Sequence, residues 1–114
     1  MSTSSDEDVR TLINEGIEIS DKYSIVDILS YSANVLRKLE LLKQEMDPDD
    51  SWRPTIVTGV DILRKYLTIL VGVISAHYRY AVIKRAASIT MTCASVCTLV
   101  IVRIGPKYNV SLDD

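Results

Sequence analysis

Apolar side chains recur every three or four positions along most of this chain, the spacing that places them on one face of an α-helix. The clearest run begins at Ser24, where a serine followed three residues later by Asp27 resembles a capping box with Asp in the usual place of Glu. The rhythm continues to Met46 and is broad enough for a bundle rather than a two-stranded seam. Its positions are Ile25, Ile28, Leu29, Ser32, Val35, Leu36, Leu39 and Leu42. We therefore expect a helix over residues 24–46.

A shorter helix is expected before this one, because a helical stripe extends from Val9 to Ile17 and predicts a helix near residues 7–22. The 24–46 helix is expected to stop at Pro48. The residue before a proline avoids α geometry, and the neighbouring Asp and Ser side chains favour turns. Residues 47–54 are therefore expected to form a loop.

A third helix is expected near residues 55–84. It is amphipathic at first and becomes apolar nearly all round beyond Tyr66, as is typical of a helix at the centre of a bundle, at an interface or against lipid. A fourth is expected near residues 87–104 and is ended by Gly105 and Pro106. A strand over 98–104 is the alternative for the last part, since β-branched residues are dense there and two copies could pair across a dimer.

Residues 86–102 contain no charge and allow a different interpretation, in which Ala86 to Val102 lies in a bilayer. Lys84 and Arg85 precede the run and Arg103 follows it, as boundary residues of a membrane segment would. The run is shorter than the ~20 predominantly apolar residues of a typical span and contains several Ser and Thr. A helix in the core of a bundle is therefore the preferred interpretation.

Together these elements predict an all-α fold, a small antiparallel bundle of about four helices. The pattern leaves open whether helices are exchanged between copies in an oligomer. One helical domain is expected over residues 7–105. It is preceded by a flexible acidic, Ser-rich tail over 1–6 and followed by a flexible tail over 106–114.

Charge divides the chain into two unlike halves. Residues 1–50 contain twelve Asp or Glu and five Lys or Arg, whereas residues 51–114 contain three acids and eight bases. A net charge of −2 therefore conceals an acidic pole and a basic pole. Contact of the acidic pole of one copy with the basic pole of another is the simplest use of this division.

The sequence contains no pattern that specifies catalysis. Its four glycines are isolated and form no phosphate-binding loop, and His77 is the only histidine. Cys93 and Cys97 lie four residues apart and would share a helix face, but a structural zinc site needs four ligands. We therefore expect no enzyme, no catalytic residues, no metal and no cofactor. Two cysteines and no signal peptide predict a reducing, cytoplasmic location, with the membrane as the alternative.

Four groups of residues are candidates for binding or modification. Trp52 and Arg53 lie in the loop, and both residue types are common at binding hot spots. Aromatic and basic residues alternate in a second group, which suits a protein partner or phosphates: Tyr78, Arg79, Tyr80, Lys84 and Arg85. The all-round apolar part of the third helix predicts self-association through Leu67, Leu70, Val71 and Ile74. Ser4 and Ser5 each precede an acid by three positions and are phosphorylation candidates.

The function expected from these patterns is that of a small non-enzymatic helical protein. It would act in interaction, assembly or regulation, as a homo-oligomer with protein partners. Compact helical proteins of this composition are common among viral accessory and scaffold proteins. A small membrane-associated protein is the first alternative. A weak nucleic-acid-binding protein is the second, and the sequence pI near 5.3 argues against it.

Overall fold

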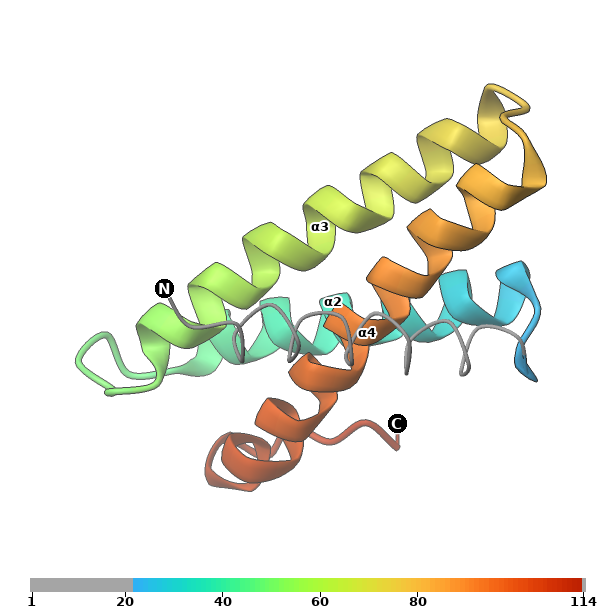
Figure 1. Ribbon diagram of the computed structural model, residues 1–114. Helices are drawn as coiled ribbons and strands as arrows, with labels where there is room; N and C mark the ends of the chain where they lie inside the picture. Colours follow the sequence, from blue (N-terminus) through green and yellow to red (C-terminus); the bar gives the residue numbers. More distant parts are fainter. Residues whose placement is uncertain (1–21, 114) are drawn as a thin grey trace, which may run out of the picture.

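The computed structural model describes residues 22–113. This part of the chain forms three α-helices that all contact one another: α2 (Ile25–Glu45), α3 (Arg53–Ser75) and α4 (Tyr80–Ile104). A 3₁₀-helix, η1 (Gly105–Tyr108), follows α4 directly. Figure 1 shows α3 and α4 joined by a tight turn at the upper right, with α4 passing across α2. The all-α class is confirmed.

The described residues form a bundle of three helices, which corrects the expected count of four. The first expected helix, 7–22, lies outside the described residues except for its last position, Lys22. The third helix, expected near 55–84, is shorter than predicted at its C-terminal end. The helix α3 ends at Ser75, and the chain reverses before α4 begins at Tyr80. The strand considered for 98–104 is wrong, since α4 is helical to Ile104.

The reversal after α3 is made by His77, which adopts the left-handed backbone conformation with φ of 55°. The N–H of Tyr78 donates to the carbonyl of Val73 at 3.0 Å, which is the outer hydrogen bond of a Schellman motif. Glycine usually occupies the left-handed position of this motif because it has no Cβ. A histidine there gives no recognisable stop signal, so the sequence does not indicate where α3 ends.

The start of α2 confirms the predicted cap. The Ser24 hydroxyl accepts a hydrogen bond from the N–H of Asp27 at 3.1 Å, which satisfies one of the free amides of the first turn. The helix ends at Glu45, and its C-cap residue Met46 has an extended backbone immediately before Asp47 and Pro48. The sequence therefore predicts both ends of α2 correctly.

The core is aliphatic and lies where the three helices meet. Its larger part is built from one stripe of each helix, including Leu39 and Leu42 of α2, Ile56 and Leu63 of α3 and Ile101 of α4. A smaller cluster at the other end joins Ile28, Leu70 and Ala87. After η1 the chain turns back, so that Val110 also packs against the larger cluster with 4% of its surface exposed.

The loop after α2 is fastened to the end of the chain through the buried carboxylate of Asp50. The hydroxyl of Tyr108 donates to it, Lys107 Nζ lies 2.9 Å from it, and the N–H of Trp52 donates to it at 2.8 Å. The hydrogen bond from Tyr108, followed by those from Lys107 and Trp52, lowers the pKa of Asp50 to about 2. We call Asp50, Lys107 and Tyr108 the C-terminal clasp.

Candidate functional site

An apolar groove of about 540 Å³ lies between α3 and α4. We call it the α3–α4 groove. Thr55, Gly59, Ile62 and Tyr66 form much of its α3 side, and Leu39 of α2 contributes to its lining. The α4 side consists of Ile89, Thr92, Cys93, Val96, Cys97 and Val100. No Lys, Arg, Asp or Glu lines this groove, so its chemistry suits an apolar surface.

Exposed apolar residues extend this groove along both helices. Ile62 and Ile69 lie seven residues apart on α3 and are 42% and 44% exposed. Val82 and Val96 lie two such intervals apart on α4 and are 38% and 51% exposed. Because seven residues are close to two helical turns, the residues of each pair share a face. Each helix therefore presents an apolar ridge beside the groove.

Gly59 contributes to the depth of the groove because it has no side chain. A Cβ placed there would lie 3.7 Å from Cys97 Sγ and 3.7 Å from Leu39 Cδ1, which is ordinary van der Waals contact. An alanine therefore fits without displacing either neighbour, and a longer side chain would project into the groove.

Cys93 and Cys97 are free thiols on the α4 side of the groove. Hydrogen bonding with Cys93 and then burial raise the pKa of the Cys97 thiol, while hydrogen bonding with Cys97 lowers the pKa of Cys93. Cys93 is therefore the more reactive of the pair. Among residues 22–113 there is no cluster of three or more His, Cys, Asp or Glu side chains that could hold a metal ion.

The four residues predicted for self-association do not form one surface. Leu70 is fully buried in the smaller core cluster, and Leu67 and Ile74 are half-buried against the two clusters. Val71 is 49% exposed. The exposed apolar residues that border the groove are instead Ile62 and Ile69 of α3 and Val96 of α4. A seven-residue spacing analysis of α3 and α4 taken together could have identified them.

Trp52 and Arg53 are directed to different parts of the structure. Trp52 is half-buried against the larger core cluster, and the guanidinium of Arg103 lies 5.7 Å from the centre of its ring. Arg53 begins α3, and its Nη1 donates to the carbonyl of Lys43 at 2.9 Å. The two side chains therefore contact different parts of the bundle, and their role in partner binding stays a prediction.

The aromatic and basic candidates gather at the turn between α3 and α4. Tyr78 and Tyr80 are 55% and 68% exposed, and Arg79 and Arg85 are also exposed. Lys84 is half-buried near the start of α4. These residues lie at one end of the bundle, away from the C-terminal clasp. The phosphorylation candidates Ser4 and Ser5 lie outside the described residues.

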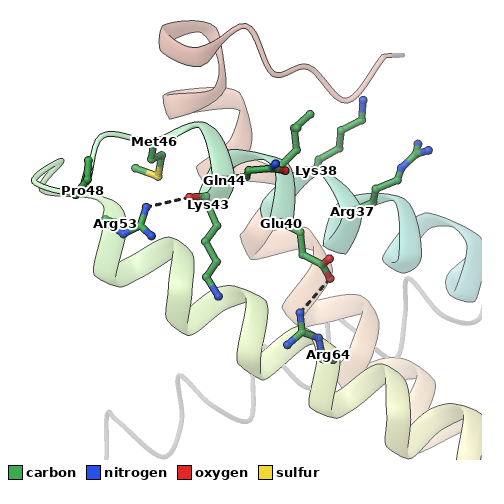
Figure 2. Close-up of a pocket in the computed structure, with 10 residues that line it drawn as sticks. Arg37, Lys38, Glu40, Lys43, Gln44, Met46, Pro48, Arg53 and Arg64 are labelled. Atoms are coloured by element: carbon green, nitrogen blue, oxygen red, sulfur yellow. Dashed lines mark hydrogen bonds and ion pairs between the residues drawn. The ribbon is translucent and has the colours of Figure 1, made fainter.

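A second cleft, of about 870 Å³, lies between α2 and α3 (Figure 2). Five of its ten lining residues are Lys or Arg, and the one acid among those ten is Glu40. The five cations are Arg37, Lys38 and Lys43 of α2 and Arg53 and Arg64 of α3. We call it the cationic cleft. The sequence did not indicate this cleft, because the α2 cations that line it lie in the half of the chain with the acidic net charge.

Comparison of the chain with protein-family models, with curated proteins and with solved structures gives no match in any of the three. The fold and the two surfaces thus define the protein only as an all-α helical bundle. Its function has to be inferred from the chemistry of its own residues.

Proposed function

We propose that this protein is a non-enzymatic association module that binds a second copy of itself through the α3–α4 groove. The observation that carries the proposal is the combination of an uncharged groove with apolar ridges on both sides. A dimer with twofold symmetry uses the same surface on both copies, so that surface must complement itself. A ridge such as that at Val96 and a groove lined by Ile62 and Tyr66 have matching apolar chemistry.

The small size of the protein favours this use of the groove. A bundle of this length buries a limited core, and four β-branched residues remain more than a third exposed along one face: Ile62, Ile69, Val82 and Val96. Contiguous exposed apolar patches on soluble proteins usually mark interaction sites. Burial of such surface is stabilising by ~25 cal/mol per Å², before the entropy of association is subtracted.

Chemical protection of Cys93 provides a direct test, because this thiol lines the groove and is only half-buried. The full chain would be treated briefly with an alkylating reagent at increasing protein concentration, and modification at Cys93 would be read by mass spectrometry. Association through the groove predicts slower modification as the concentration rises. A rate of Cys93 alkylation that is independent of protein concentration would show that the groove is not the interface.

Membrane association is a second candidate, and one observation favours it. The helical stretch Tyr80–Tyr108 is long and apolar enough to cross a membrane, with a mean hydropathy of 1.8 in its most apolar window, of which 39% is buried. Against this stands the position of α4, which contacts both α2 and α3 and contributes Ala94, Cys97 and Ile101 to the core. Insertion of α4 in lipid would require this core to open. Recovery of the protein only in detergent would favour the membrane.

A further inference from the structure

Three cations line the part of the cationic cleft where α2 faces α3. Arg53 Nη1 donates to the carbonyl of Lys43 at 2.9 Å, which holds this guanidinium beside the last turn of α2. Arg64 Nη2 lies 3.2 Å from Glu40 Oε1. Figure 2 shows the side chain of Lys43 extending towards α3, between Arg53 and Arg64 in that view. No carboxylate among residues 22–113 pairs with the Lys43 ammonium group.

The charge of this cluster defines the kind of ligand that suits it. Five cations line the cleft and Glu40 is the one acid among its lining residues, so the lining carries an excess of four positive charges. Such an excess suits a multiply charged anion such as a phosphomonoester, which carries about −1.5 to −2 at neutral pH. Guanidinium groups suit phosphoryl oxygens because they donate two parallel hydrogen bonds. A carboxylate carries a single negative charge and neutralises less of this excess.

We propose that the cationic cleft binds the phosphomonoester group of a small organic ligand, with Lys43 and Arg64 contacting the phosphoryl oxygens and Arg53 adding positive charge to the same cleft. Leu41 and Pro48 also line the cleft and are exposed, so they offer apolar contact to the organic part of the ester. An organic phosphate therefore binds more tightly than inorganic phosphate. This site is separate from the α3–α4 groove and does not depend on self-association.

Glu40 acts in this site as a competitor that the ligand displaces from Arg64. The side chains of Arg64 and Glu40 are 53% and 46% exposed, so their ion pair contributes little to stability. Its exchange for a phosphoryl group therefore costs little. Replacement of Glu40 by glutamine removes the competing charge and strengthens the binding of an anion. A tighter complex is a result that an unfolded variant cannot imitate.

The test is a titration of the full chain with phenyl phosphate at constant ionic strength, followed by backbone amide chemical shifts. We expect saturable shifts confined to α2 and α3 around the cleft, and weaker binding of inorganic phosphate. Lys43→Ala should weaken the affinity for phenyl phosphate about tenfold or more. Glu40→Gln should strengthen it by about threefold. Arg79→Ala, which removes an exposed cation at the other end of the bundle, should leave it unchanged.

Three results would overturn the proposal. The first is an equal loss of affinity in Lys43→Ala and Arg79→Ala, which would mean that phosphate binds exposed cations without preference. The second is an unchanged affinity in Glu40→Gln. The third is displacement of phenyl phosphate from the cleft by a short RNA strand of comparable or higher affinity, because the site would then serve phosphodiesters. Circular dichroism of each variant confirms that the fold is retained.

Discussion

The hydroxyl of Tyr108 donates a hydrogen bond to the buried carboxylate of Asp50, across 58 residues of sequence. This contact holds the loop between α2 and α3 against the segment that follows α4. Lys107 Nζ lies 2.9 Å from the same carboxylate and completes the C-terminal clasp. Two parts of the chain that the sequence analysis treated as a plain loop and a loose tail are thereby joined in one structure.

The clasp predicts a specific dependence of stability on pH. The pKa of the Asp50 carboxyl is about 2 in the folded protein, against 3.8 for a free aspartate carboxyl. A carboxyl whose pKa is lowered by folding stabilises the fold above its unfolded pKa, and this contribution disappears as the pH falls through the folded pKa. Tyr108→Phe removes the largest cause of the shift. Urea unfolding should therefore show that wild type exceeds this variant in stability at pH 5, and that the difference shrinks towards pH 2.

A difference between wild type and Tyr108→Phe that is the same at pH 5 and at pH 2 would contradict this account of the clasp. Tyr23→Phe is the matched control, because Tyr23 is 51% exposed and precedes α2. Its stability should follow that of wild type at every pH.

The cap of α2 predicts a modest and local effect. Ser24→Ala removes the hydroxyl that accepts from the N–H of Asp27, and we expect a loss of about 1 kcal/mol in the free energy of unfolding. Ser30→Ala is the control, since Ser30 is an exposed residue in the interior of the same helix. The control should be neutral or slightly stabilising because alanine has the higher helix propensity. Equal effects of the two substitutions would show that Ser24 does not act as a cap.

The glycines of α3 and η1 predict opposite responses to alanine. A Cβ at Gly72 would meet nothing within 4 Å, so Gly72→Ala should stabilise the helix by roughly 0.5–1 kcal/mol. A Cβ at Gly105 would overlap the carbonyl oxygen of Val110, the residue whose N–H donates to the carbonyl of Gly105. Gly105→Ala should therefore destabilise the protein, because backbone must move. Thermal unfolding of both variants measures the contrast, and a stabilising Gly105→Ala would contradict the packing of the chain after α4.

The core predicts the largest loss of stability. Ile56 is fully buried between the three helices, and Ile56→Ala should lower the free energy of unfolding by about 2–5 kcal/mol. Val26→Ala is the control because Val26 is 69% exposed on α2. Its effect should stay within about 0.5 kcal/mol. Denaturant unfolding measures the stability of both variants. Similar losses in the free energy of unfolding would contradict the assigned core.

The sequence predicts those features of this fold that depend on residues close together along the chain. Ser24 and Asp27 set the start of α2 through a hydrogen bond between residues three positions apart, and Pro48 lies two residues after the C-cap Met46. The reversal after α3 could not be predicted, because His77 occupies a position where glycine is the usual signal. The clasp could not be predicted either, since Asp50 and Tyr108 meet only through the packing of the whole bundle.

The two surfaces were missed for a similar reason. The α3–α4 groove combines residues of two helices, and its ridges become visible only when Ile62 and Val96 are placed side by side. The cationic cleft brings Lys43 of the acidic half against Arg53 and Arg64 of the basic half. Charge counted along the chain assigned these residues to opposite poles. Over residues 22–113 there are twelve Lys or Arg and eight Asp or Glu, so the described bundle is itself basic.

Self-association through the α3–α4 groove is tested most directly by the mass of the full chain in detergent-free buffer. Light scattering coupled to size-exclusion chromatography should give twice the 12.8 kDa of one chain. Val96→Asp, which places a charge on an exposed ridge of the groove, should weaken the dimer on the order of a hundredfold and give a monomer with unchanged helicity. Val26→Asp, on the exposed side of α2, should remain a dimer. A wild type with the mass of one chain at every concentration, or a dimer that Val96→Asp leaves intact, would contradict the proposal.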